Sequence, residues 1–303
     1  MKVISYLKTV PARNSNLQKP EILKKFIQGV NVCGDTGIVS NSDTAESADV
    51  AVIQGWVYSD ISSLHLKLRK KLIDTQTVVS GDANLFLYKD KVNPHGYIRY
   101  SFNGIFPTTG IYCDAEIDPT RWQQISKDTN IQLENYKTTG RHIVVLLQRD
   151  KGWSLKGVDV QQWTINVVNQ LRKYTDRPIV IRPHPGDKTT HMYIKSLTRA
   201  LHHIKNVQIS SIGTPLEHNL ANAWAVVNHN SSAAVGPIIQ GYYCFLTDPI
   251  DSQCAEVSNT DFSKIELPMQ FDRQQWLERI SMFHWKFSEL EDGSCWKHMR
   301  KYI

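Results

Sequence analysis

Buried-strand patterns alternate with helical patterns along the second half of this sequence. The strand patterns are short runs of aliphatic and aromatic residues, and they cover 141–150, 179–181, 206–210, 224–230 and 242–248. The helical patterns between them cover 160–174, 191–204, 217–223 and 231–241. Strands buried on both faces and separated by helices are typical of a parallel, doubly wound sheet. We therefore predict a Rossmann-like domain of the α/β class in this half.

The first half shows the same alternation and then loses it. Strands are predicted over 2–7, 48–56 and 76–88, the last with a Gly-Asp turn inside it. One helix is predicted from Lys19 or Pro20 through Gly29, and a second after a cap at Ser62 or Ser63, with Leu64, Leu68 and Leu72 on one face. Residues 94–140 are rich in Gly, Pro and aromatic residues, which predicts a functional loop region containing a short helix over 119–128.

The run Arg177–Asp187, RPIVIRPHPGD, places charged residues directly after a buried strand. In open α/β sheets, ligands bind in the crevice outside the carboxyl ends of the strands. Arg182 and His184 are therefore candidates for binding a phosphate group, because charged N–H donors pair strongly with phosphate oxygens. The alternative is that a Pro-rich turn carries polar residues only because it is exposed.

A second group of polar residues follows the strand at 224–230. The group consists of His229, Asn230, Ser231 and Ser232, and it begins a helical pattern. The first N–H groups of a helix bind anions, so this segment is predicted to hold a donor phosphate or ribose. The alternative is an ordinary serine cap on a packed helix.

A third group lies in the first βα connection of this half, where pyrophosphate commonly binds. Its candidates are Gln148, Arg149 and Ser154. The dinucleotide fingerprint GxGxxG and the P-loop pattern GxxxxGK[ST] are both absent, which disfavours a nicotinamide or flavin enzyme.

Two aspartates of the first half are candidates for a general base. Asp82 in SGDANLF and Asp35 in CGDTG are each predicted to lie in a Gly-flanked turn after a strand. A carboxylate there could take a proton from an attacking hydroxyl. An Asp beside Gly is explained equally well by turn chemistry alone.

Cations and aromatic residues of the first half are candidates for binding an acceptor. The candidates are Lys67, Lys70 and Lys71 on a helix face, and Arg99, Tyr100 and Asn103 in the segment YIRYSFNGIF. Lysines on one face could contact a polyanion, and an aromatic, Gly-rich loop could stack a sugar or a base. The alternative for the lysines is a solvated helix face.

Composition narrows the class of protein. The net charge of +6 favours polyanionic partners. No apolar run approaches the roughly 18 residues of a membrane span, and the amino-terminal residues do not resemble a signal peptide, so a cytoplasmic location is expected. The five cysteines show no CxxC or Cys/His pairing, which predicts neither a zinc site nor a disulfide framework.

The motifs RPHP and NHNSSAAVGPIIQG, with the later segment FHWKFSELEDGSCW, resemble GT-B glycosyltransferases. The resemblance covers roughly residues 48–300 and is greatest to the capsule-polysaccharide synthesis type, related to Kdo transferases, and to phage-borne proteins. It implies two facing Rossmann-like domains, an acceptor domain over 1–138 and a nucleotide-sugar domain over 139–275, with helices over 276–303 returning to the first.

The resemblance also implies roles for single residues. Gln148 becomes a donor-loop residue, Arg182 and His184 contact the diphosphate, and Ser231 and Ser232 hold the donor phosphate or ribose. The pattern S-S-x-x-x-E-A-x-x-x-G has Gly236 in place of its Glu, so the resemblance does not identify the donor.

The predicted activity is transfer of a sugar from a nucleotide sugar to an acceptor hydroxyl, with no cofactor. No metal is expected, since Arg, His and helix termini can neutralise the leaving diphosphate. The charge and the stand-alone size favour a hydroxylated base in double-stranded phage DNA as acceptor. A capsule polysaccharide transferase, a sugar-nucleotide epimerase and a non-catalytic nucleotide- or DNA-binding protein remain alternatives.

Overall fold

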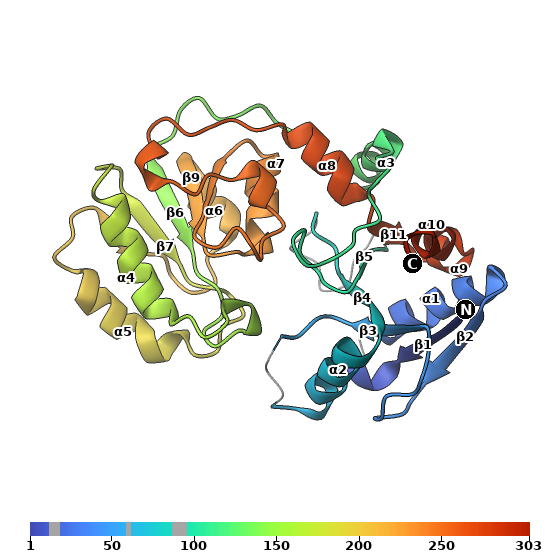
Figure 1. The fold of residues 1–303 in the computed structure, drawn as a ribbon. Helices are drawn as coiled ribbons and strands as arrows, with labels where there is room; N and C mark the ends of the chain where they lie inside the picture. The colour runs from blue at the N-terminus through green and yellow to red at the C-terminus, as the bar shows by residue number, and fades with distance from the viewer. Residues whose placement is uncertain (12–18, 59–61, 87–95) are drawn as a thin grey trace. The chain divides into compact units, whose positions relative to one another are not determined.

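The computed structural model describes residues 1–11, 19–58, 62–86 and 96–303, and it divides into two compact units (Figure 1). Unit 1 comprises Met1–Ile131 and Leu277–Ile303, and unit 2 comprises Gln132–Trp276. The predicted domain boundaries fall after residues 138 and 275. Each unit has its own sheet and its own apolar core.

Unit 1 is built on a six-stranded sheet. Its strands are β1 (Lys2–Tyr6), β2 (Thr36–Ser40), β3 (Val50–Gln54), β4 (Thr77–Ala83), β5 (Tyr97–Phe102) and β11 (His284–Lys286). The order is β11-β5-β4-β3-β1-β2, in which β1 to β4 run parallel and β5 pairs antiparallel with both β4 and β11. The chain reverses its direction of winding between β1 and β3, which makes this the switch point of the sheet.

The helices of unit 1 are α1 (Lys19–Val32), α2 (Leu64–Thr75), α3 (Pro119–Thr129), α9 (Phe287–Glu291) and α10 (Ser294–Met299), and α8 (Arg273–Ser281) crosses the unit boundary. Helix α1 begins with Pro20 in its first turn and buries Ile22, Phe26 and Val30 at helical spacing. Its core includes Trp296 of α10, so the last residues of the chain complete the core of unit 1 (Figure 1).

Three predictions for the first half are wrong. Strand β4 continues through Gly81 and Asp82 without a turn. The aromatic segment YIRYSF is not a loop but the fully buried strand β5, because it pairs on both sides. Leu64 is 77% exposed and does not share the buried face of Leu68 and Leu72. Residues 87–88 of the strand predicted over 76–88 lie outside the described residues. The same is true of residues 94–95 of the loop predicted over 94–140.

Unit 2 contains a five-stranded parallel sheet. Its strands are β6 (His142–Leu146), β7 (Ile179–Arg182), β8 (Val207–Ile209), β9 (Ala223–Asn228) and β10 (Tyr243–Leu246). Its helices are α4 (Val160–Leu171), α5 (Thr190–Leu201), α6 (Leu216–Leu220) and α7 (Val235–Ile239). The order β10-β9-β6-β7-β8 confirms the predicted doubly wound sheet and puts the switch point between β6 and β9.

Helices cover both faces of this sheet, with α4 and α5 on one face (Figure 1). The side chains of Ile143, Val145 and Ile181 pack under them and are completely buried. The helix predicted over 231–241 is shorter than expected: a 3-10 turn, Ser232–Ala234, precedes the five-residue α7. Pro237 lies within α7 and cannot donate a backbone hydrogen bond. Among the described residues, no helix has the length and apolarity that crossing a membrane requires.

Candidate functional site

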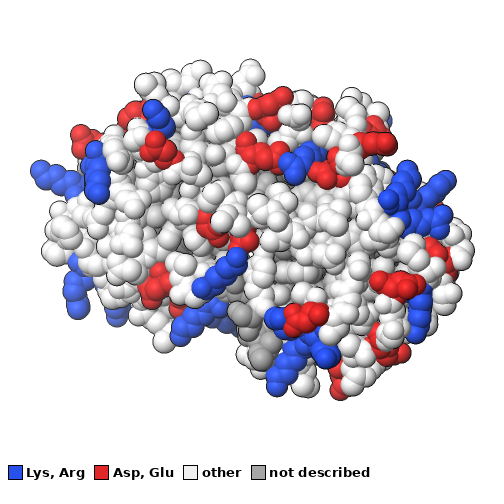
Figure 2. Space-filling view, viewed as in Figure 1, with Lys and Arg blue, Asp and Glu red and all other residues white. Residues whose placement is uncertain are grey.

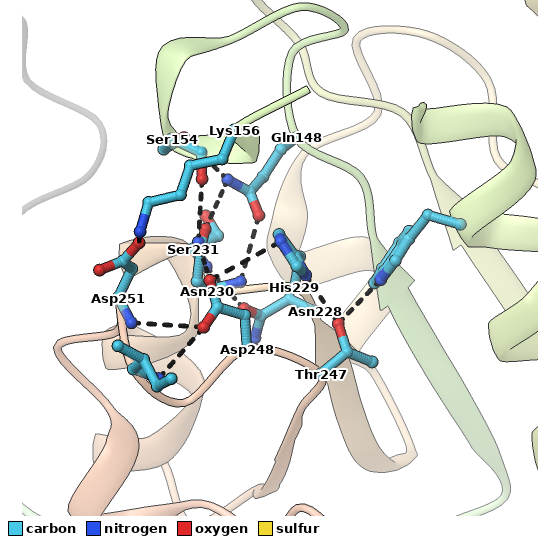
Figure 3. A network of polar contacts seen from close by, with 12 residues as sticks. Gln148, Ser154, Lys156, Asn228, His229, Asn230, Ser231, Thr247, Asp248 and Asp251 are labelled. Carbon is cyan, nitrogen blue, oxygen red and sulfur yellow. Dashed lines mark hydrogen bonds and ion pairs between the residues drawn. The ribbon is translucent and has the colours of Figure 1, made fainter. Parts of the chain in front are cut away.

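The loops after β6 and β9 are joined by side chains at the switch point of unit 2 (Figure 3). Gln148 Nε2 donates to Asn230 Oδ1 at 2.8 Å, and the backbone N–H of Asn230 donates to Gln148 Oε1 at 3.2 Å. Gln148 Nε2 also donates to Ser154 Oγ at 3.1 Å. Three residues that were predicted to bind the sugar donor therefore lie together. They come from two loops, and the loops meet because parallel strands end at the same edge of the sheet.

Asp248, which sequence reasoning missed, belongs to the same network. Asn230 Nδ2 donates to Asp248 Oδ2 at 2.9 Å and to the backbone oxygen of Ser154 at 3.0 Å. Asp248 follows β10, so the rule that ligands bind beyond strand ends could have identified it. Asp248 therefore adds a carboxylate to the amide and hydroxyl groups of Gln148, Asn230 and Ser154.

His229 lies beside this network. Thr247 Oγ1 accepts from Trp163 Nε1 at 2.8 Å and forms a hydrogen bond with His229 Nδ1, also at 2.8 Å. Burial lowers the pKa of His229, although Asp248 Oδ2 lies 3.8 Å from its Nε2. Thr247 and Trp163 were not predicted, and their contacts fix the orientation of the imidazole.

Ser231 has the contacts of an ordinary cap. Its Oγ accepts from the backbone N–H of Ala233 at 3.2 Å, and its own N–H donates to Asn228 Oδ1 at 2.7 Å. Because the helix that follows is only five residues long, its dipole at Ser231 and Ser232 is smaller than the predicted helix would provide. Ser231 therefore caps the helical segment that follows it, as the alternative interpretation predicted.

The loops after β6 and β7 bring Arg149 against His184. A Cβ on Gly186 would lie 3.0 Å from Arg149 Nη2 and 3.2 Å from His184 Cε1, so the glycine leaves the space that the guanidinium occupies. Asp187 lies in the same turn, but it accepts from Thr189, Tyr193 and the backbone N–H of Asp150. Its carboxylate is therefore already hydrogen-bonded within the protein.

His184 is a neutral N–H donor at physiological pH. Burial, with the nearby charges of Arg149 and Arg182, lowers the pKa of His184 to about 4. Its Nδ1 accepts from the backbone N–H of Gly186 at 3.0 Å, which places the ring proton on Nε2.

Arg182 has unused donors. Its Nη2 donates to the backbone oxygen of Thr214 at 3.2 Å, and its Nε is buried without a hydrogen-bond partner in the described part of the chain. Burial lowers the pKa of Arg182, but the group stays charged at neutral pH. Among the residues that the structure describes, neither Arg149 nor Arg182 forms a salt bridge.

A further ion pair that the sequence did not reveal joins Lys156 to Asp251 (Figure 3). Asp251 is completely buried in the loop after β10, whereas Lys156 belongs to the loop after β6 and is half exposed. An unpaired buried carboxylate is strongly destabilising. The pair therefore holds the β6 loop close to the β10 loop.

The predicted general bases have other partners in unit 1. Asp82 lies in β4, not in a turn, and its Oδ2 accepts from Arg99 Nη2 at 2.9 Å. Asp35 follows α1 and precedes β2, so it does not follow a strand. Its carboxylate accepts from the Met1 amino group and from Trp296, contacts that lower its pKa and tie α10 to the sheet.

Some of the residues predicted to bind the acceptor are buried, and others are exposed. Arg99 is 8% exposed, and Tyr100 is fully buried with its hydroxyl donating to the backbone oxygen of Ile22. Asn103 Oδ1 accepts from the backbone N–H of Val78 at 2.9 Å. Stacking of a base on Tyr100 is therefore contradicted, because its ring has no exposed face. Lys67 and Lys71 are exposed, and Lys70 pairs with Asp74.

No group of three or more His, Cys, Asp or Glu side chains is placed to hold a metal ion in the part of the chain that the structure describes. The five cysteines are free thiols. Metal independence and the absence of a cofactor stay predictions.

Two solved structures of KpsC from Thermosulfurimonas dismutans are similar to this chain. One, described as a beta Kdo 2,7 transferase, has a TM-score of 0.53 at 13% sequence identity and matches over 94% of this chain and 92% of that chain. The other, a beta Kdo 2,4 transferase, has a TM-score of 0.50 at 12% identity, over 93% and 90%. No known protein family matches the sequence, and no curated protein matches it. Similarity at this level of identity concerns the fold, and it confirms the predicted class: the chain has a GT-B fold.

Proposed function

We propose that this protein is a glycosyltransferase that binds a nucleotide-sugar donor in unit 2. The proposal is supported by the GT-B fold and by the polar groups at the carboxyl edge of its parallel sheet. Loops after β6, β7, β9 and β10 all contribute to this edge, which is where open α/β sheets bind their ligands.

The cluster of Arg149, Arg182 and His184 is the observation that carries the proposal. It combines two guanidinium groups without a salt bridge among the described residues with a neutral imidazole N–H. Such a set suits a diphosphate, whose oxygens accept charge-assisted hydrogen bonds. The same donors would stabilise the negative charge that develops on the diphosphate as the sugar–oxygen bond breaks.

The network around Asn230 suits the hydroxyl groups of a donor. Asp248 and Gln148 present carboxylate and amide groups at the same edge of the sheet as the cation cluster, and such groups orient sugar hydroxyls by hydrogen bonding. Gly236 replaces the Glu of the related pattern, and Asp248 is our candidate for the carboxylate that this replacement removes. We assign the donor's ribose or sugar hydroxyls to this network.

The acceptor hydroxyl would lose its proton to a carboxylate of unit 1, for which Asp82 remains our candidate. Its side chain is 22% exposed, so a substrate can reach it. A hydroxylated base in DNA remains one proposed acceptor, with Lys67 and Lys71 contacting phosphates, and a surface glycan is the other. Figure 2 shows Lys and Arg in small groups among Asp and Glu on the visible face, without one continuous basic surface.

Donor binding is tested by calorimetric titration with a nucleoside diphosphate. We expect Arg149→Gln and Arg182→Gln each to weaken binding by roughly tenfold or more, because each loses a charge-assisted hydrogen bond. Lys195→Gln, which removes an exposed cation of α5 in the same unit, is the matched control and should bind like the wild type. Equal affinity of all four proteins would contradict the proposed donor site.

Turnover is tested by mass spectrometry with a panel of nucleotide sugars. Each sugar is offered with hydroxymethylated DNA, with a surface glycan or without any acceptor. A mass increment on DNA or glycan supports transfer and identifies the acceptor. Conversion of the donor to an isomer without acceptor would instead favour an epimerase, and binding without any conversion would contradict an enzyme.

A further inference from the structure

Three residues from three strands of unit 1 form a row on one face of the sheet. Asp82 of β4 is paired in register with Arg99 of β5, and Arg99 is paired with His284 of β11. Residues directly opposite one another in a sheet point to the same face. The row is buried, except that the side chain of Asp82 is 22% exposed.

Arg69 of α2 extends this row at the switch point between β1 and β3. Its Nε and Nη2 donate to the backbone oxygen of Thr9, beyond β1, and Nη2 also donates to Gln54 Oε1 at the end of β3. A Cβ on Gly55 would lie 3.1 Å from Arg69 Nη1, so the guanidinium lies where a side chain beside Asp82 would project. The negative charge of the Asp82 carboxylate favours the charged form of the Arg69 guanidinium.

The row holds more positive than negative charge. Two guanidinium groups, from Arg69 and Arg99, share the single carboxylate of Asp82. His284 adds no charge, because burial lowers its pKa to about 3. The nearby Arg121 is paired with Glu289 at 2.7 Å. Among the described residues, the row therefore has one excess positive charge.

Several hydrogen-bond donors at this edge also lack partners within the described ranges of the chain. Arg99 uses Nη2 for Asp82, and its Nε and Nη1 are buried with no hydrogen-bond partner among the described residues. Trp56 Nε1, two residues past the end of β3, and Asn84 Nδ2, just past the end of β4, are likewise buried without a partner in the part of the chain that the structure describes. Buried N–H groups are almost always paired, so this concentration points to a bound acceptor of hydrogen bonds.

We propose that Arg69 and Arg99, beside Asp82, bind a carboxylate or phosphate group of the acceptor. The identification of this anion as part of the acceptor substrate rests on the proposed function. The binding of an anion does not depend on it. An anion supplies both the negative charge and the hydrogen-bond acceptors that the row lacks. Because Arg99 is 8% exposed, the row suits a single small acidic group rather than a polymer backbone. An acidic sugar or sugar phosphate would then present its hydroxyl next to Asp82.

The test uses the full chain with nitrogen-labelled arginine and three probes: glucuronate, glucose 6-phosphate and glucose. We expect at least one acidic probe to shift the Arg99 Nε–H resonance, and glucose to leave it unchanged. A response to glucuronate alone or to glucose 6-phosphate alone identifies the acidic group. If neither acid shifts the resonance, the proposal is overturned, and water is the remaining partner of these donors.

Variants assign the binding to the row. Arg69→Gln and Arg99→Gln should each weaken binding of the acidic probe by roughly tenfold. Lys127→Gln removes an exposed cation of α3 in the same unit and should bind normally. Unchanged binding in the first two variants would overturn the proposal. Should Arg99→Gln fail to fold, Arg69→Gln and the wild-type resonance still decide.

The same titrations separate this inference from the proposed donor site. Arg149→Gln should lose affinity for the nucleoside diphosphate and keep its affinity for the acidic probe. A wild-type protein that binds the acidic probe but no nucleoside diphosphate would refute the proposed function and leave the anion site standing. The reverse result would refute only the anion site.

Discussion

At the residue scale, a buried imidazole links the stability of unit 1 to pH. His284 Nε2 accepts from the backbone N–H of Leu85 at 3.1 Å, and its Nδ1 lies 2.7 Å from the backbone oxygen of Ile280. Burial and the charges of Arg99 and Arg121 lower the pKa of His284 to about 3. Below the usual histidine pKa of about 6.5, the unfolded chain binds a proton that the folded chain refuses. Stability is therefore lost as the pH falls from about 6.5 toward 3.

We predict that His284→Gln reduces this pH dependence. At pH 7 the variant should be less stable by about 1–3 kcal/mol, because a buried backbone group loses its partner. Between pH 7 and pH 5, its free energy of unfolding should fall by roughly 2 kcal/mol less than that of the wild type. Urea unfolding at both pH values measures this, with exposed His191→Gln as control. An unchanged pH dependence in His284→Gln would contradict the prediction.

Residue-level prediction from sequence succeeded where strand ends set the position. Gln148 and Asn230 both follow strands of one parallel sheet, so their proximity follows from local patterns. Lys156 could not be identified in this way, because its role depends on the burial of Asp251 in a distant loop. Asp82 was predicted to lie in a turn, but it lies in strand β4. A Gly-Asp pair favours a turn only where the segment is not paired with a neighbouring strand, and here β5 pairs with it.

At the scale of elements, α1 and α9 meet through a glycine. A Cβ on Gly29 would lie 1.9 Å from the backbone oxygen of Leu290 and 3.0 Å from the Cα of Gly293. Backbone atoms cannot rotate away as the end of a side chain can. The helices are thus fixed at a separation that only glycine permits.

We predict that Gly29→Ala destabilises unit 1 by more than about 3 kcal/mol, because α9 must move away from α1. The neighbouring exposed residue gives the matched control: Gln28→Ala should change stability by less than about 0.5 kcal/mol. Urea unfolding followed by circular dichroism measures both. Equal stability of the two variants would show that the contact between α1 and α9 is not required.

Elements were predictable from sequence where their partners were nearby in the chain. The strands of unit 2 alternate with helices, so each apolar run could be recognised by itself. Strand β5 could not, because it is stabilised by β4 on one side and by β11, far along the chain, on the other. Strand β2 is a largely exposed edge strand without an apolar run, and it was not predicted. The short α7 reflects Pro237, which the helical pattern underestimated.

At the scale of the whole molecule, the two units have separate cores. Phe26 is 1% exposed in the core of unit 1, and Phe245 is completely buried in that of unit 2. We predict that Phe26→Ala destabilises unit 1 by about 3–5 kcal/mol. Hydrogen exchange should accelerate at the amides of β3 and β4 and stay unchanged at those of β6 and β9. Phe245→Ala should give the opposite pattern, and equal acceleration in both units would contradict separate cores.

The discontinuity of unit 1 has a consequence for synthesis on the ribosome. Unit 1 needs Leu277–Ile303 for its strand β11 and for Trp296 in its core, and these residues emerge after all of unit 2. Unit 2 consists of one uninterrupted segment, so it can fold before the residues that complete unit 1 have been synthesised. Nascent-chain folding should therefore run against the usual order, in which the amino-terminal part folds first.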